Sequence, residues 1–138
     1  MKLLNLFRAS NSPAITIDEI QLVNRSALFV QPQEHYLKWA AHVSGESLTK
    51  IRHDLGSISP KVFLIAESES LPEESTLKEL APLIFESMLD DWWHERETWP
   101  QDRSYAIFKN WFTITHSSEA FDLCTTKLKR DPIDNYGV

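Results

Sequence analysis

The chain has 138 residues, a formal net charge of −6, 42% hydrophobic residues and 25% charged residues. This length and composition predict one domain over 1–138, with a core that needs neither disulfide bonds nor a structural metal. The acidic surplus repels phosphate backbones, which argues against a nucleic-acid-binding protein. The lone cysteine, Cys124, excludes an internal disulfide bond and a cysteine-based zinc site. Together with the lack of a long apolar run, it predicts a cytoplasmic protein that does not span a membrane.

Strands are predicted wherever a short apolar or alternating run ends at turn residues. These runs cover 14–17, 26–30, 62–66, 111–115 and 120–124. The last two flank a Ser-Ser-Glu turn, so residues 111–124 are a candidate β-hairpin.

Helices are predicted where apolar residues recur at 3-4 spacing. They cover 32–44, 48–54, 77–93 and 103–110. Pro32 suits the first turn of the first helix, Gly45 suits its C-cap, and Ser47 can cap the second. Pro82 predicts a kink in the third helix or a division into two, and Asp102 is the expected N-cap of the fourth. The apolar stripe of the third helix predicts burial of Leu80, Ile84, Phe85, Met88 and Leu89.

The order of these elements favours an α+β fold, with a small, mainly antiparallel sheet and helices packed chiefly on one face. The sheet is expected to contain 26–30, 62–66, 111–115 and 120–124. A doubly wound α/β sandwich is the alternative, because a strand–helix–strand order occurs early in the chain. Residues 1–12 are predicted to form a loose arm and residues 125–138 a mobile tail.

Three of the five tryptophans lie at or just after the end of the third predicted helix. Adjacent helical residues point about 100° apart, so Trp92 continues the buried stripe while Trp93 lies at its edge or beyond the helix end. A partly exposed Trp93 beside Trp99 would form an aromatic platform for a ligand or a partner chain.

Acidic residues surround one histidine next to these tryptophans. Asp90 and His94 are four residues apart and share a helix face, and Asp91 adds a second carboxylate. Such groups can ligate a metal, but the spacing lacks a second ligand motif, so neither a metal nor another cofactor is expected.

Arg103 is expected in the first turn of the fourth helix, where a cation opposes the helix dipole and needs a carboxylate partner. The candidate partners on the third helix are Glu86, Asp90 and Asp91. We predict that Arg103 bridges the two helices, stacks on a tryptophan and fixes the loop over 94–101, which then presents Trp93 or Trp99 to solvent.

The Trp99-Pro100-x-x-Arg103 element, followed by Trp111-Phe112, resembles a family of small bacterial proteins of unknown function. The resemblance covers about residues 24–124 and includes Ile84-Phe85-Glu86, Leu89, Trp92, Phe108 and Asp122-Leu123. It implies a compact cytosolic domain and carries no activity or site with it.

The sequence therefore predicts a non-enzymatic protein-binding or adaptor module, since aromatic and arginine side chains are the usual anchors of interfaces. Its expected binding residues, on an aromatic-acidic surface around 91–103, are Asp91, Trp93, His94, Trp99 and Arg103. One alternative is a small metal-assisted hydrolase centred on Asp90, Asp91 and His94. Another is an immunity or inhibitor protein for a basic partner, which fits the net charge. No catalytic residue is predicted, and the partner and the oligomeric state stay open.

Overall fold

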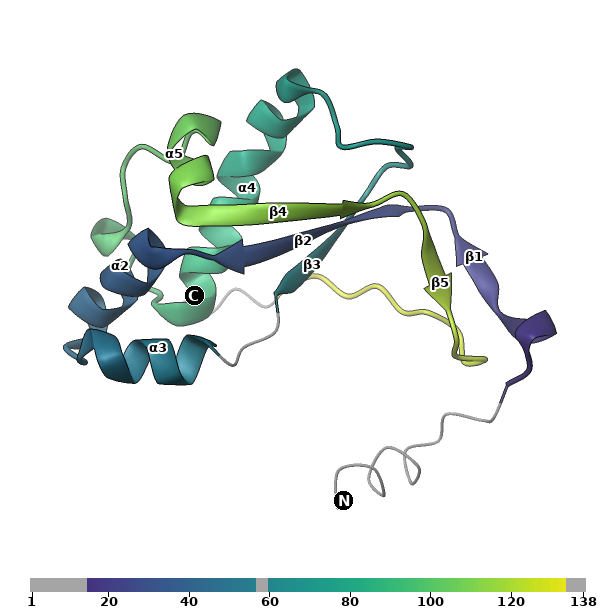
Figure 1. Ribbon diagram of the computed structural model, residues 1–138, viewed down its shortest axis with the longest axis horizontal. Helices are drawn as coiled ribbons and strands as arrows, with labels where there is room; N and C mark the ends of the chain where they lie inside the picture. Colours follow the sequence, from purple (N-terminus) through teal and green to yellow (C-terminus); the bar gives the residue numbers. More distant parts are fainter. Residues whose placement is uncertain (1–14, 57–59, 134–138) are drawn as a thin grey trace, which may run out of the picture.

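The computed structural model describes residues 15–56 and 60–133, and over these residues the predicted α+β class is confirmed (Figure 1). The elements in chain order are η1 (Ile17–Glu19), β1 (Gln21–Val23), β2 (Ser26–Pro32), α2 (Glu34–Ser44), α3 (Leu48–Gly56), β3 (Lys61–Ile65), α4 (Glu74–Trp92), η2 (Arg96–Thr98), α5 (Tyr105–Trp111), β4 (Phe112–Ser117) and β5 (Ala120–Asp122). Every strand pair in the described ranges is antiparallel, so the doubly wound alternative is wrong.

The main sheet has the strand order β3-β2-β4, with β2 in the centre. Leu28 and Val30 of β2 are fully buried and pack into a core formed with α2, α3, α4 and α5. On the opposite sheet face, Val62 and Leu64 of β3 are about half exposed. Figure 1 shows the helices gathered around one end of the sheet, with α4 running across the strands.

Helix α4 supplies the centre of this core. Phe85 is fully buried, and its ring centroid lies 5.1 Å from that of Phe112, 5.2 Å from that of Trp111 and 6.0 Å from that of Phe108. The predicted burial of Ile84, Phe85, Met88 and Leu89 is confirmed, whereas Leu80 is only partly buried. The apolar stripe thus identified the correct helix face.

Helix α4 is continuous through Pro82 and begins three residues before the predicted start. Proline removes one backbone hydrogen bond, but Ala81 and Phe85 on either side are almost fully buried in the core. Tertiary packing therefore keeps α4 as one helix.

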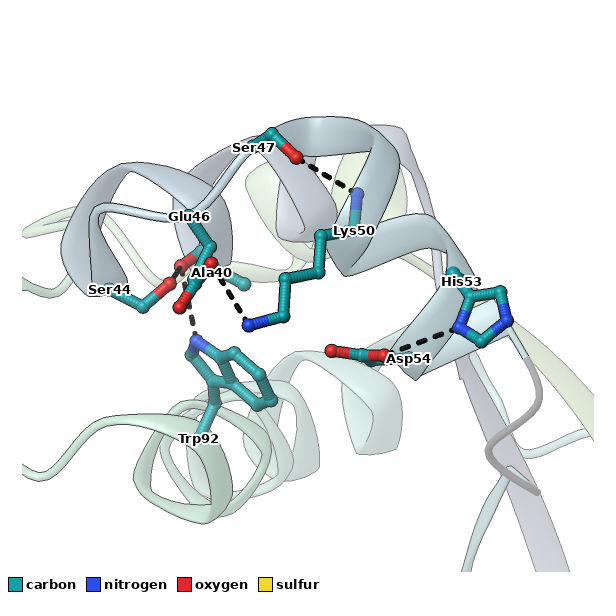
Figure 2. Close-up of polar contacts among 8 residues, drawn as sticks. All are labelled: Ala40, Ser44, Glu46, Ser47, Lys50, His53, Asp54 and Trp92. Atoms are coloured by element: carbon teal, nitrogen blue, oxygen red, sulfur yellow. Dashed lines mark hydrogen bonds and ion pairs between the residues drawn. The ribbon is translucent and has the colours of Figure 1, made fainter.

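The caps of the first two helices are confirmed. Gly45 ends α2 with a φ of 69°, a left-handed conformation that glycine adopts without steric cost. The Ser47 hydroxyl accepts the backbone N–H of Lys50 at 3.1 Å and so caps α3 (Figure 2). Pro32, by contrast, does not start α2. It is the last residue of β2, opposite Phe112, and α2 begins at Glu34.

The strand predicted over 14–17 is wrong for its described part. The Glu19 N–H donates to the Thr16 carbonyl at 3.0 Å, and this turn produces the 3-10 helix η1. The strand of this region is β1, further along the chain. The predicted loose arm over 1–12 lies outside the described residues.

The predicted hairpin over 111–124 is also wrong, because β5 pairs with β1 rather than with β4. Strand β4 stays paired with β2 as far as the Ala27–Ser117 pair, so the chain beyond it runs beside the residues that precede β2. The strand opposite β5 is therefore β1. Figure 1 shows this β1–β5 ribbon bent away from the main sheet, at the opposite end of the molecule from α2 and α3.

Ser26 lies at the junction where the β1–β5 ribbon leaves the main sheet. Its fully buried hydroxyl accepts the Ser68 N–H at 2.8 Å. The carbonyls of Ser68 and Ser118 lie 3.1 and 2.9 Å away, and share its single hydroxyl hydrogen. One side chain therefore ties β2 to two distant segments of the chain.

After β5, residues 125–133 form no helix or strand, and their side chains are exposed. The mobility of the tail over 125–138 stays a prediction, and residues 134–138 lie outside the described part of the chain.

Candidate functional site

Residues 93–104 connect α4 to α5, and we call this segment the tryptophan loop. It begins where Trp93 leaves the helical conformation, with φ −148° and ψ 121°. It ends later than predicted, because α5 starts at Tyr105 and Ser104 occupies the N-cap position. Asp102 is therefore not the cap. Its carboxylate accepts the Ser104 N–H at 3.0 Å. Hydrogen bonds from the Ser104 side chain and backbone hold the pKa of Asp102 below its ordinary value.

Three indole N–H groups pin the tryptophan loop and the end of α4 to main-chain carbonyls. The Trp39 N–H donates to the Thr98 carbonyl at 3.0 Å, and the Trp99 N–H donates to the Trp93 carbonyl at 2.8 Å. The Trp92 N–H donates to the Ala40 carbonyl of α2 at 3.1 Å. A tryptophan ring that is both packed and hydrogen-bonded has little freedom, so these contacts make the loop rigid.

Figure 2 shows Trp92 reaching from α4 toward the end of α2. The carbonyl that it contacts, that of Ala40, also accepts the Ser44 hydroxyl at 2.7 Å. On the adjoining α3, Lys50 pairs at 3.1 Å with Glu46, which precedes that helix, and the two side chains are 55% and 41% exposed. Trp92 is partly buried at this contact, so the stripe of α4 continues to this residue with less burial than at Leu89.

Trp99 is only 4% exposed, so the predicted solvent-facing platform at this residue is wrong. The guanidinium carbons of Arg96 and Arg103 lie 5.5 and 5.9 Å from its ring centroid, within the range of cation–π contact. Trp93 is partly buried, as predicted for a residue at the stripe edge. Its indole nitrogen is inaccessible and has no hydrogen-bond partner within the described residues.

Arg103 pairs with a carboxylate of α4, as predicted, but it lies in the tryptophan loop rather than on α5, so the predicted bridge between two helices is wrong. Its guanidinium donates to Glu86 at 2.9 Å and to the Pro100 carbonyl at 2.7 Å. The side chains of Arg103 and Glu86 are 25% and 41% exposed, so solvent screens part of this pair. Arg103 lies before α5 rather than in its first turn, so the helix dipole does not account for the pairing.

Two separate ion pairs contain the residues of the alternative metal-assisted hydrolase, Asp90, Asp91 and His94. Asp90 lies 3.1 Å from His94, whereas Asp91 forms an ion pair with Lys61 of β3 at 3.0 Å. In the ranges that the structure describes, no cluster of three or more histidine, cysteine, aspartate or glutamate residues could hold a metal ion. The negative charge of Asp91 acts on Tyr36. Burial is the main cause of that hydroxyl's raised pKa, and the charge raises it further.

Of the five predicted binding residues, Asp91 and His94 are exposed, Trp93 and Arg103 are partly buried, and Trp99 is buried. The structure gathers them around one loop, together with exposed Glu95 and Glu97, which the sequence analysis did not select.

A second surface escaped the sequence analysis. Five apolar residues around the β1–β5 ribbon line a shallow open groove: Ile17, Ile20, Leu22, Phe121 and Leu123. Their signal in the sequence is a pair of short alternations, one before residue 23 and one after residue 120.

Comparison of the chain with protein-family models, curated proteins and solved structures gives no match. Across 15–56 and 60–133, no helix combines the length and the apolar character needed to cross a bilayer.

Proposed function

We propose that the protein is a non-enzymatic protein-binding module that presents the tryptophan loop to a positively charged segment of a partner protein. The observation that carries the proposal is a rigid loop backbone with exposed acidic side chains. The carbonyls of Trp93 and Thr98 are pinned by indole N–H groups, and Glu95 and Glu97 between them are exposed.

A rigid loop supports binding because little conformational entropy is lost when a partner orders it further. Carboxylates at its surface speed the association of a positively charged partner and disfavour the binding of acidic proteins. In this proposal the buried indoles hold the loop in shape, and the charged side chains make the contact.

An inhibitor or immunity protein would bind a basic partner through the same charged groups. It would differ from an adaptor in that binding blocks the activity of the partner. The metal-assisted hydrolase is less well supported, because Asp90 and Asp91 have different partners on different elements.

The test is affinity capture from an extract of the source organism, with the whole chain as bait and mass spectrometry as readout. Glu95→Gln/Glu97→Gln removes two charges from the loop. Glu67→Gln/Glu69→Gln removes two equally spaced exposed charges elsewhere. We expect a protein that the wild type and the control capture equally, and that the loop variant captures about tenfold less.

Capture should also weaken as salt is raised, because surface charges are screened. A partner that both double variants retain equally would contradict the role of the loop. No specific capture by any of the baits would contradict the proposed function.

A further inference from the structure

The β1–β5 ribbon has one face made of apolar side chains alone. Leu22 of β1 lies directly opposite Phe121 of β5, so the two project from the same face. Ile20 and Leu123 are two residues away on each chain and share that face by alternation. Leu22 is 61% exposed and Phe121 is 57% exposed, so the described chain leaves this face uncovered.

Such a face is unfavourable for an isolated chain in water. A two-stranded ribbon by itself is marginally stable and needs a further layer packed on its apolar side. Large contiguous apolar patches on soluble proteins usually mark a surface that is covered in the assembled state. The other face of the ribbon carries Gln21 and Asp122, opposite each other, and is suited to solvent.

We propose that a second copy of this chain covers the apolar face, so that two ribbons stack face to face in a symmetric dimer. The polar residues of the ribbon strands lie on the opposite face, so two copies can meet without bringing Asp122 against Asp122. Identical apolar patches are self-complementary, as a two-fold interface requires.

The apolar area of the ribbon face is large enough for a dimer interface. Five large apolar side chains, most of them more than half exposed, present on the order of 500 Å² per copy. Two copies therefore bury about 1,000 Å², the lower bound of a specific interface.

The shape of the molecule also favours a second copy despite the net charge of −6. Figure 1 shows the ribbon bent away from the end of the molecule where the helices gather. Stacked ribbons keep the two acidic bodies apart, and charges further apart than about 8–10 Å are largely screened at physiological salt. This inference rests on the ribbon alone and is independent of the tryptophan loop.

Analytical ultracentrifugation of the full chain tests the proposal over a range of concentrations. We expect a dimer that dissociates on dilution. Leu22→Ser/Phe121→Ser should shift the equilibrium to monomer by at least tenfold in dissociation constant. Leu83→Ser is the matched control, because Leu83 is 67% exposed on α4 and lies outside the ribbon. It should leave the dimer unchanged.

A cross-link keeps the test valid if the ribbon variant folds poorly. In a Cys124→Ser background, Phe121→Cys should form a disulfide between copies on mild oxidation, and Leu83→Cys should not. A wild type that stays monomeric at every concentration, or a dimer that the ribbon substitutions leave intact, would overturn the proposal. If removal of residues 1–12 from such a monomer raises hydrogen exchange in β1 and β5, the occupant is the chain's own N-terminal segment, and the dimer is wrong.

Discussion

Around the tryptophan loop, three indole N–H groups donate to main-chain carbonyls, whereas on the β1–β5 ribbon the side chains of Leu22 and Phe121 are more than half exposed. Both regions are rich in large apolar groups. They differ in the polar atom that an indole carries, since its N–H can be held by a carbonyl while the ring packs. Leucine and phenylalanine side chains have no such atom, and only another apolar surface can cover them.

The difference separates two uses of apolar residues. In the proposed function, tryptophans at the end of α4 fix the backbone that displays charged groups, so their effect on binding would be indirect. In the proposed dimer, the ribbon residues are themselves the contact surface. Four experiments, each with a comparison variant, test this division, beginning with the core that supports the tryptophan loop.

Phe85 is the centre of the body that supports the tryptophan loop. Phe85→Ala should lower the free energy of unfolding by about 3–5 kcal/mol, because it leaves a cavity among Phe108, Trp111 and Phe112. Exposed Leu83→Ala on the same helix should change it by less than about 0.5 kcal/mol. Denaturant melts measure both, and a loss below about 1 kcal/mol for Phe85→Ala would place the core elsewhere.

Trp99→Phe tests directly whether a hydrogen-bonded indole contributes more to stability than an exposed apolar side chain of the ribbon. It removes the N–H that the Trp93 carbonyl accepts and shrinks a buried ring, so unfolding should become easier by roughly 2–3 kcal/mol. Trp93→Phe removes the same atoms, but the Trp93 indole nitrogen has no hydrogen-bond partner in the described residues. This substitution should therefore lower the free energy of unfolding by less than Trp99→Phe does. Leu22→Ser, measured at low protein concentration, should cost less than about 0.5 kcal/mol. A greater loss for Leu22→Ser than for Trp99→Phe would reverse the comparison.

Arg103→Ala should destabilise the protein by about 1–2 kcal/mol, because Glu86 and the Pro100 carbonyl lose a donor while solvent still reaches Glu86. Arg103→Lys should recover less than half of this loss, because an ammonium cannot serve both acceptors with a planar fork. Thermal melts and the near-ultraviolet circular dichroism of the tryptophans report the effect. If both variants match the wild type, Arg103 does not hold the loop.

Ser26→Ala should cost about 1 kcal/mol, because the buried Ser68 N–H loses its acceptor. Hydrogen exchange should rise in β1 and β5 more than in α4. Ser118→Ala is the control, since the Ser118 backbone carbonyl that faces Ser26 is kept. Equal exchange in the two variants would remove Ser26 from the junction.

Local patterns predicted the parts of the molecule that local forces determine. The spacing of Ile84, Phe85 and Met88 identified the buried face of α4, and Glu86 was one of the three carboxylates predicted as partners of Arg103. The caps at Gly45 and Ser47 follow from conformations within a few residues.

The remaining features depend on contacts between distant segments. Trp99 is buried because the loop folds back to place the Trp93 carbonyl beside its N–H, and spacing alone does not encode that return. The pairing of β5 with β1 follows from the path of β4 along β2, so a local hairpin pattern predicted the wrong neighbour. The exposed ribbon face was missed for the same reason.

The Ser26 hydroxyl has a consequence for the order in which the chain folds. It meets groups that are 42 and 92 residues away along the sequence. Closing long loops costs configurational entropy, and contacts of large sequence separation slow folding. The segments at Ser68 and Ser118 follow β3 and β4, so both strands must pair with β2 before the hydrogen bonds of Ser26 can form. We therefore expect the ribbon beyond it to form after β2, β3 and β4 have paired, and to open before they separate.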